Sequence, residues 1–535
     1  MAEQGHGGLA ATHALKALGV DRIFTLSGGH IFPIFDGCKQ DDIRIVDVRH
    51  EQNAVFAAEG WARLTRSLGV GVVTAGPGVT NAISPLAQAK FNAAPVLVLA
   101  GRAPEFRWGQ GSLQEIDHVP FVDPVAPAKT VLDTAQVAAE VVAAAHAALT
   151  PPRGPRFLDF PLDVLFNNAD IEVPDARLPT DDTSTRDGDG TSIAGLIEAS
   201  ERPVIVAGSN VWLDRAEDEL VRLVEAGEIP VFTNGQGRGC VPADHRLAFS
   251  RARSTALKEA DLVIVVGTPL DFRLGFGQFG SAKVAHIDHR RAEHVELAAQ
   301  EDGLIAPVLA AIADDLKTPP DTKQWVERLR KVEDDKRDAA QAELHSTQTP
   351  IHPMRVYGEL VPLLDRDAVV IGDGGDFVSY AGREVPSYEG GSWLDPGPFG
   401  CLGVGPGYAM AARLAHPDRQ VVLLYGDGAV GFSAGELESL VRHKLPVVAI
   451  VGNNGIWGLE KHPMRGLYGY DVAADLQPGL RYDRMMESFG GRGEFVTDPD
   501  ELAPALKRAL DSGEPTLVNV VTDPEIAYPR SANLA

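Results

Sequence analysis

The feature that most constrains the fold is an alternation of short apolar strand patterns with amphipathic helix patterns, which recurs along the chain in three blocks. The first block contains the strand patterns DRIFTLSGG, IRIVDVR, GVGVVTAGPG and APVLVLAG, and helix patterns such as EQNAVFAAEGWARLT lie between them. Strands that alternate with helices form parallel sheets that are covered by helices on both faces. We therefore predict an α/β protein with three doubly wound parallel-sheet domains.

The same alternation sets the predicted domain boundaries. An N-terminal α/β domain covers residues 1–175, a central one covers residues 190–318, and a C-terminal one covers residues 350–535. The stretch at 176–192 is rich in Pro, Gly, Asp and Thr, which predicts a linker. Residues 319–350 are charged and helix-prone, so we expect a solvated connecting helix there.

Charge and cysteine content limit the partners and the compartment. A formal net charge of −25 disfavours nucleic acid and anionic membranes as partners. Cys38, Cys240 and Cys401 lie far apart without CxxC spacing, so we expect neither a disulfide framework nor a zinc site. The sequence contains no apolar run of about 18 residues, so we expect no membrane span. The N-terminal segment is unlike a signal peptide. We expect a cytoplasmic protein that acts on a small molecule.

The most specific motif lies in GDGAVGFSAGELESLVRHKLPVVAIVGNNGIWG. The pattern predicts a strand, a Gly-Asp-Gly turn, a helix and a second strand that ends in Asn-Asn. Asp427 and Asn454 would then each follow the carboxyl end of a parallel strand, the edge at which open α/β sheets bind ligands. A carboxylate and an amide oxygen suit Mg²⁺ that also holds phosphate oxygens.

This pattern resembles the diphosphate-binding motif of thiamine diphosphate-dependent enzymes, and the resemblance extends along essentially the whole chain. It implies thiamine diphosphate and Mg²⁺ as cofactors. Asp427 and Asn454 would bind the metal through their side chains, and Ile456 would bind it through its main-chain carbonyl. Gly428 and Ala429 would contact the diphosphate.

The resemblance also implies residues that bind the rest of the cofactor. The segment RHEQNAVFAAEGWAR resembles the family's pyrimidine-binding domain, in which the residue that matches Glu51 is catalytic. A carboxyl group that is hydrogen-bonded to N1′ of the aminopyrimidine favours the imino tautomer. The imino nitrogen then removes the C2 proton of the cofactor. In GPFGCLGVGPGYAMAA, Leu402 matches the apolar residue that wedges the cofactor into a V shape, and the Gly400 carbonyl and Leu402 N–H would bond the pyrimidine. Further cofactor contacts are implied at Gly76, Asp376 and Phe377.

The family also implies an assembly and a reaction centre. Its two cofactor-binding domains meet across a dimer interface, so we expect a homodimer or homotetramer in which Glu51 serves a cofactor held by the partner chain. The segment GQGSLQEIDHVPFVDPV resembles the lining of the reaction centre, which makes Gln114 a candidate for substrate contact. Gly29 and His30 lie in a loop that would face C2, although a loop hydrogen bond is an alternative role for His30. We expect His118 to be structural.

The central domain bears on the reaction. GRGCVPADHRLAFSRARSTALKEADLVIVVGTPLDFRLGFG resembles CoA-handling lyases, in which the residue matching Arg253 meets an adenosine phosphate. ADP or CoA is therefore a possible ligand of this domain, and a surface position is the alternative for Arg253. The flavin-contacting pattern of acetolactate synthases is altered to G-T-P-L-D-F-R, which argues against FAD. The absence of a basic C-terminal lid argues against CoA.

Three functions remain open from the sequence. The leading prediction is a 2-hydroxyacyl-CoA lyase type of carbon–carbon lyase or carboligase, which reversibly cleaves a 2-hydroxyacyl-CoA to formyl-CoA and an aldehyde or ketone. The alternative is an acetolactate synthase, which decarboxylates pyruvate and ligates the product to a second 2-keto acid. The remote alternative is an inactive paralogue that only binds its ligands.

Overall fold

A computed structural model describes residues 3–177 and 191–529 of the chain. The chain divides into two compact units, which are described separately. Unit 1 consists of residues 1–181, 396–417 and 432–445, and unit 2 consists of residues 182–395, 418–431 and 446–535. The predicted linker at 176–192 lies largely outside the described residues. Within the described ranges, no helix has both the length and the apolar character that a bilayer span requires.

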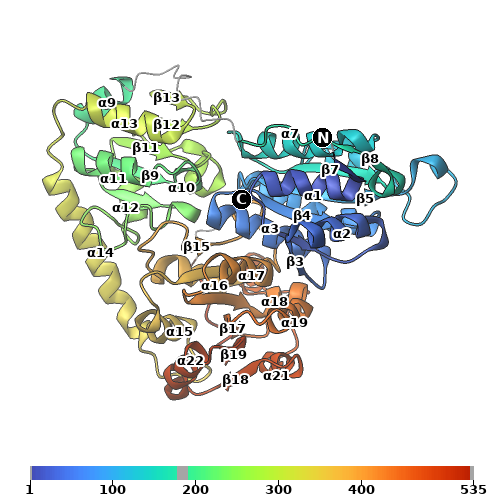
Figure 1. The fold of residues 1–535 in the computed structure, drawn as a ribbon. Coiled ribbons are helices and arrows are strands. Elements are labelled where there is room, and N and C mark those ends of the chain that lie inside the picture. Colours follow the sequence, from blue (N-terminus) through green and yellow to red (C-terminus); the bar gives the residue numbers. More distant parts are fainter. Residues whose placement is uncertain (1–2, 178–190, 530–535) are drawn as a thin grey trace. The chain divides into compact units, whose positions relative to one another are not determined.

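Unit 1 is built on a six-stranded parallel sheet with the strand order β3-β2-β4-β5-β7-β6. Its strands are β2 (Arg22–Thr25), β3 (Arg44–Asp47), β4 (Gly69–Val73), β5 (Val96–Arg102), β6 (Ala128–Thr130) and β7 (Arg156–Pro161). One face is covered by α1 (Gly7–Ala17), α2 (Phe32–Asp41) and α7 (Val137–Leu149), and α3 (Glu51–Thr65) lies on the other face (Figure 1). β4 and β5 are buried along their whole length, as their apolar sequences predict.

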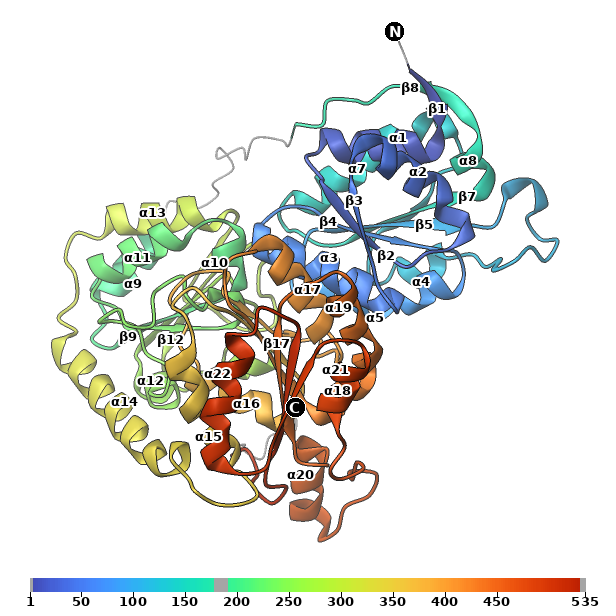
Figure 2. The same ribbon diagram turned by 60° about the horizontal axis from the view of Figure 1, so that its bottom comes forward.

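Unit 1 also contains two features that the strand and helix patterns do not indicate. β1 (Glu3–His6) pairs antiparallel with β8 (Asn168–Ile171), although EQGH has no apolar alternation. The C-terminal third of the chain contributes α17 (Gly405–Ala415) and α19 (Leu437–Arg442), and α17 packs beside α3 (Figure 2). The two helices approach closely because they meet at glycines: a Cβ on Gly60 would lie 3.0 Å from the Tyr408 ring, and one on Gly407 would lie 2.9 Å from Phe56 Cβ.

The first sheet of unit 2 is parallel and has the order β10-β9-β11-β12-β13. Its strands are β9 (Pro203–Ala207), β10 (Val231–Thr233), β11 (Leu262–Val266), β12 (Lys283–Asp288) and β13 (Ala299–Asp302). One face packs against α9 (Thr191–Glu198), α11 (Glu217–Ala226) and α13 (Ile305–Asp315), and the other packs against α12 (Arg253–Glu259) and α14 (Lys323–Leu344). α14 is the expected connecting helix, but it is not fully solvated, because Trp325 and Leu329 are buried in the core of this sheet.

The second sheet of unit 2 is also parallel and has the order β15-β14-β16-β17-β19-β18. Its strands are β14 (Val369–Asp373), β15 (Trp393–Leu394), β16 (Val421–Gly426), β17 (Val448–Asn453), β18 (Arg492–Val496) and β19 (Thr516–Val521). A core of buried side chains joins one face to α15 (Pro353–Leu360), α16 (Gly375–Glu384) and α22 (Leu502–Leu510). The three parallel sheets confirm the predicted fold class.

The three large sheets share one topological feature. In each, the chain passes from the first strand to a neighbour on one side and then returns to a neighbour on the other side. This switch point lies between β2 and β4, between β9 and β11, and between β14 and β16. Loops that diverge at a switch point leave room for a ligand at the carboxyl edge of the sheet. The candidate site residues are found at these edges.

Candidate active site

The predicted metal ligands lie where three neighbouring strands of the C-terminal sheet end. Asp376 follows β14, Asp427 follows β16 and Asn454 follows β17, and these strands are adjacent in the sheet. The ends of β16 and β17 are level, because Gly426 pairs with Gly452. The Asn454 side-chain amide donates a hydrogen bond to Asp376 Oδ2 over 3.3 Å, so an acidic pair and an amide meet at one edge.

Asp427 is a buried carboxylate without a charge-neutralising hydrogen bond among its measured contacts. Its side chain is 4% exposed, and it accepts the N–H groups of Gly428 and Gly455 over 2.8 and 2.7 Å. Burial raises the pKa of Asp427 to about 7, and the nearby carboxylate of Asp376 adds to this rise. Burial also raises the pKa of Asp376. A bound cation would relieve the cost of ionising both groups.

The donors at this edge fit Mg²⁺. Carboxylate and amide oxygens are hard ligands, and Mg²⁺ is commonly held by one or two carboxylates together with substrate phosphates. Among the described residues, no three or more His, Cys, Asp or Glu side chains are grouped so that they could complete a metal site alone. A cation at Asp427 would therefore also need other oxygens. The main-chain carbonyl of Ile456 and a diphosphate are the partners that the sequence predicts.

The other predicted cofactor contacts of this sheet edge, Gly428, Ala429 and Phe377, pack against neighbouring residues of the protein. A Cβ on Gly428 would lie 2.4 Å from the Trp457 ring, so packing alone requires glycine there, and the Gly428 N–H donates to Asp427. Ala429 is buried. The Phe377 ring packs near Tyr357, 5.4 Å between ring centroids, and the Phe377 N–H donates to Asp376. Contacts of Gly428, Ala429 and Phe377 with diphosphate remain predictions.

Glu51 lies in unit 1 as the first residue of α3, shortly after β3. Its side chain is 7% exposed, and its Oε2 accepts a hydrogen bond from Asn81 Nδ2 over 3.0 Å. Asn81 ends the short helix α4 (Pro77–Asn81), which Gly76 introduces with φ +59° and ψ −112°, a conformation that favours glycine. Asn81 was not predicted as a site residue. The only signal for it was its place at the end of the turn that follows GPG.

Gly76 also brings together two residues of a later loop. Its N–H donates to His118 Nε2 over 3.0 Å, and His118 Nδ1 lies 2.8 Å from Asp159 Oδ2. Because Nε2 accepts a hydrogen bond, the ring proton is on Nδ1 and is donated to Asp159. Gln114 has φ +60° and packs on Gly76, where an added Cβ would lie 2.8 Å from Gln114 Cβ. These contacts support the structural role expected for His118.

His30 lies at the β2/β4 switch point, in the 3₁₀ turn η1 (Gly29–Ile31). Its Nδ1 is 3.2 Å from Thr74 Oγ1, and its side chain is buried. Gly101 of β5 makes room for it, because a Cβ there would lie 2.4 Å from His30 Cβ. Burial lowers the pKa of His30. His30 is therefore an uncharged hydrogen-bonding group at neutral pH, and Gly29 beside it is exposed.

Gly400 and Leu402 belong to unit 1, and Cys401 between them contacts α5 (Ile83–Phe91). The N–H of Cys401, between them, donates to Gln88 Oε1 of α5 over 3.0 Å. Gly400 is exposed, has φ +74°, and has no atom within 4 Å of an added Cβ. Leu402 is half-buried. The backbone around Gly400 is therefore open to a ligand while the next residue is held.

Comparison with known proteins identifies the family to which the chain belongs. Three family models match the chain in order: the N-terminal TPP binding domain of thiamine pyrophosphate enzymes at residues 6–121, the central domain of these enzymes at 191–314 and their C-terminal TPP binding domain at 373–520. Together they span more than half of the chain. The chain belongs to the thiamine pyrophosphate enzyme family. It is thus an enzyme that depends on thiamine pyrophosphate, which is also called thiamine diphosphate.

Individual members of the family are similar over nearly the full length. The acetolactate synthase large subunit IlvG of Mycobacterium tuberculosis is 54% identical over an alignment of 544 residues, which covers 99% of this chain and 98% of the relative. The 2-hydroxyacyl-CoA lyase 2 of Caenorhabditis elegans is 34% identical, with 96% and 89% coverage. The lyase of the same name from Danio rerio is 32% identical, with 96% and 91% coverage.

The central domain of this family member contains a cationic cluster at its carboxyl edge. Arg253 begins α12, and its guanidinium donates to Asn234 Oδ1 over 2.6 Å. Burial lowers the pKa of Arg253 to about 10, and the neighbouring Arg273 contributes to this shift. Arg253 is therefore not an ordinary surface residue. Arg253 beside the Asn234 amide would suit an anion, whereas the Arg273 guanidinium is paired with Asp271 over 2.7 Å. None of ADP, CoA and FAD gains support from the relatives.

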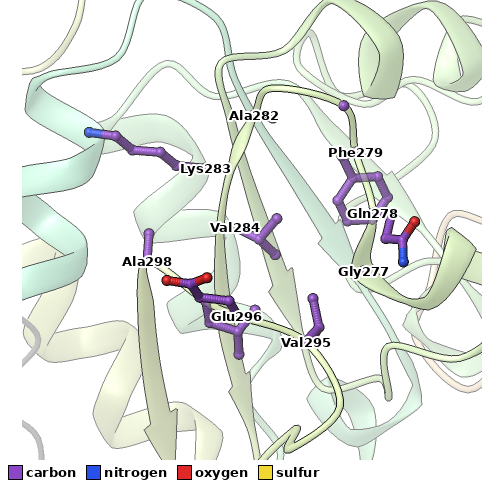
Figure 3. Close-up of a pocket in the computed structure, with 11 residues that line it drawn as sticks. Gly277, Gln278, Phe279, Ala282, Lys283, Val284, Val295, Glu296 and Ala298 are labelled. Carbon is purple, nitrogen blue, oxygen red and sulfur yellow. The ribbon is translucent and has the colours of Figure 1, made fainter.

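The central domain also has a groove of about 520 Å³ (Figure 3). Its lining combines the apolar side chains of Phe279, Val284 and Val295 with the charged side chains of Lys283 and Glu296. The groove lies at the amino ends of β12 and β13, whereas parallel sheets bind ligands at the carboxyl ends. It contains none of the predicted site residues and is not a candidate active site.

Proposed function

We propose that this enzyme is of the acetolactate synthase type, which decarboxylates pyruvate and joins the remaining two-carbon unit to a second 2-keto acid. The observation that carries the proposal is the 54% identity over 99% of the chain with a protein named acetolactate synthase large subunit, against 34% for the lyase of C. elegans. The comparisons thus favour the alternative function over the leading sequence prediction, which relied on local likeness in the central domain.

Glu51 is the proposed proton-transferring group. Bound thiamine diphosphate supplies a nucleophilic carbon and an electron sink. The Asn81 amide holds Oε2 of Glu51, and Oε1 lies 3.7 Å from the position that a Cβ on Gly78 would take. A small residue there leaves space beside Oε1. We assign to Glu51 the hydrogen bond with N1′ of the aminopyrimidine, and to Asn81 the orientation of the carboxyl group.

Asp427, Asn454 and the main-chain carbonyl of Ile456 are the proposed ligands of Mg²⁺. The hydrogen bond from Asn454 to Asp376 fixes the rotation of the Asn454 amide, so Asp376 orients a metal ligand. His30 and Gln114 are the proposed substrate contacts of unit 1. Because burial lowers the pKa of His30, its ring acts as a hydrogen-bonding group and not as a cation at neutral pH.

We also propose that two copies of the chain form the active sites, with Glu51 of one copy serving the cofactor held by Asp427 of the other. The test is to mix the inactive variants Glu51→Gln and Asp427→Asn after dissociation. If sites are shared, each mixed dimer has one intact site, and random pairing restores about a quarter of the wild-type activity. If each chain completes its own site, the mixture stays inactive.

The reaction itself is tested by mass spectrometry of products formed with thiamine diphosphate and Mg²⁺. One tube receives pyruvate alone, and a second receives formyl-CoA with an aldehyde or ketone. Acetolactate in the first tube supports the proposal, and Glu51→Gln should abolish it. A 2-hydroxyacyl-CoA in the second tube, with no acetolactate in the first, would return the enzyme to the lyase type. That second function is favoured by Arg253 and Asn234, which would suit a CoA phosphate.

A further inference from the structure

A buried polar network connects α3, the helix that begins at Glu51, with α5 and α17 of unit 1. Glu59 and Arg63 of α3 lie 3.5 Å apart, and neither is more than 1% exposed. Tyr408 of α17 donates its hydroxyl proton to Glu59 and accepts hydrogen bonds from Arg63 over 3.0 Å and from Gln88 over 2.9 Å. Asn92 donates to Glu59 over 2.7 Å. Every polar side chain of this network thus has a partner inside the protein.

Gln88 also makes a contact outside this network, with the backbone of Cys401. Its Nε2 donates to Glu59 over 3.2 Å and to Tyr408, so the rotation of its amide is fixed. The opposite end of the same amide, Oε1, therefore points away from Glu59 and accepts the N–H of Cys401 over 3.0 Å. Cys401 lies between Gly400 and Leu402.

The backbone of the same segment is held at further points by α5 and its C-terminal end. Asn92 donates to the Pro396 carbonyl over 3.3 Å, and the Cys401 thiol lies 3.7 Å from the Ser84 carbonyl. Phe399 stacks on Phe91, with ring centroids 5.3 Å apart. The contacts lie on either side of Gly400, whose own backbone is open. α5 and the residue after it, Asn92, thus hold residues 396–401, while Gly400 itself is exposed.

We propose that Gln88 is a positioning residue for recognition of the aminopyrimidine: it transmits the rigidity of the Glu59 network to the segment that presents the Gly400 carbonyl and the Leu402 N–H. The inference rests on the proposed cofactor roles of these two residues. The Cys401 N–H lies in the same peptide plane as the Gly400 carbonyl, and the two groups point in opposite directions. Its hydrogen bond to Gln88 therefore fixes the direction of the Gly400 carbonyl, and the Leu402 N–H belongs to the next peptide plane. Gln88 itself touches neither cofactor nor substrate.

The test separates pyrimidine recognition from general stability with two ligands and two matched variants. Dissociation constants are measured by calorimetry for thiamine diphosphate and for inorganic diphosphate, each with Mg²⁺. Inorganic diphosphate lacks the pyrimidine. Gln88→Met removes the acceptor for Cys401 at nearly constant volume. Tyr408→Phe removes a hydrogen-bonding group from the same network but leaves the bond between Gln88 and Cys401.

In Gln88→Met, we expect the dissociation constant of thiamine diphosphate to rise about tenfold while that of inorganic diphosphate stays within about twofold. In Tyr408→Phe, we expect the ratio of the two constants to equal that of the wild type, even if the melting temperature falls. Lys90→Ala, an exposed change on the same helix, should alter neither constant. Equal losses for both ligands in Gln88→Met, or the same ratio change in Tyr408→Phe, would overturn the proposal.

A second variant keeps the proposal testable if Gln88→Met does not fold. Gln88→Glu retains an acceptor for the Cys401 N–H, and its carboxyl group beside buried Glu59 would share one proton with that residue in place of the amide hydrogen bond. We therefore expect its ratio to stay within about threefold of the wild type. A tenfold loss that is specific to thiamine diphosphate in this variant would contradict the positioning role. Failure of the proposed cofactor roles has a different signature, because the wild-type protein itself would then bind thiamine diphosphate no more tightly than inorganic diphosphate.

Discussion

Two buried carboxylates of the molecule, Glu59 in unit 1 and Asp427 in unit 2, have opposite surroundings. Burial raises the pKa of both. Glu59 has Arg63 at 3.5 Å and accepts hydrogen bonds from neutral side chains, so its charge is compensated within the protein. Asp427 accepts only backbone N–H groups among its measured hydrogen bonds, and the nearby Asp376 is a second carboxylate.

The difference distinguishes a structural carboxylate from one that is prepared for a ligand. A buried charge that is paired and fully hydrogen-bonded can be kept for the fold alone. Two neighbouring carboxylates at the end of adjacent strands destabilise the ligand-free protein, and this destabilisation is relieved when a cation binds. A strongly perturbed pKa is therefore a guide to function only when the partners of the group are known.

The largest effect is expected from Asp427→Asn. Removing a metal ligand should lower the rate of product formation by about a thousandfold or more, because several kcal/mol of charge stabilisation are lost. The ligand-free variant should melt at a higher temperature than the wild type, since it no longer buries a carboxylate beside Asp376. A product assay measures the change in rate, and scanning calorimetry with and without Mg²⁺ and thiamine diphosphate measures the change in melting temperature. Glu59→Gln is the control: it should lower the melting temperature and keep the requirement for Mg²⁺.

Removing the counter-charge of Glu59 is expected to have the next largest effect. Arg63→Met leaves a carboxylate that is fully buried without its cation, which should cost about 3–5 kcal/mol of unfolding free energy. Denaturant unfolding, followed by circular dichroism, measures this loss. The double variant Arg63→Met/Glu59→Gln should recover part of the stability, because no buried charge remains. A single variant as stable as the wild type would show that Glu59 does not need Arg63.

The smallest effect concerns Glu436, whose surroundings are intermediate. It is 1% exposed and accepts the Arg49 N–H over 3.0 Å, and burial raises its pKa to about 7, well above the ordinary value for Glu. The native state therefore keeps a proton that the unfolded chain loses, so the stabilising contribution of Glu436 decreases as pH rises through this window. The total decrease is at most on the order of 3 kcal/mol.

Thermal unfolding between about pH 5 and pH 8 measures this contribution. The melting temperature of the wild type should fall relative to that of Glu436→Gln as the pH rises. The two proteins should differ least in slope below the pKa of the unfolded side chain, where Glu436 is protonated in both states. A difference in melting temperature that is constant with pH would show that Glu436 does not titrate in this range.

Much of the fold could be predicted from the sequence because buried parallel strands have continuous apolar runs. The runs VVLLYG and VAIVGN became β16 and β17, and the polar residues after them, Asp427 and Asn454, lie at adjacent strand ends as predicted. β1 was not predicted, because EQGH has neither apolar alternation nor a turn signal. The partial burial of α14 was also missed, since Trp325 and Leu329 are isolated apolar residues in a charged helix.

The parts of the site that escaped prediction depend on contacts between distant segments. Asn81 and Gln88 are ordinary polar residues of a short helical stretch, and no local pattern shows that one contacts Glu51 and the other the Cys401 backbone. Glu59 and Arg63 have the spacing of a surface ion pair on a helix, yet α17 buries them. Such roles require knowledge of which segment packs on the helix, and the sequence of the helix does not contain it.

The most direct test of the difference between Glu59 and Asp427 is the melting temperature of dialysed wild-type protein with Mg²⁺ alone, thiamine diphosphate alone, or both together. We expect the melting temperature to rise clearly with both ligands together, and we expect Glu59→Gln to keep this rise and Asp427→Asn to lose it. If the melting temperature of the wild type did not rise, or rose equally in Asp427→Asn, the assignment of Asp427 as the cation-binding carboxylate would be contradicted.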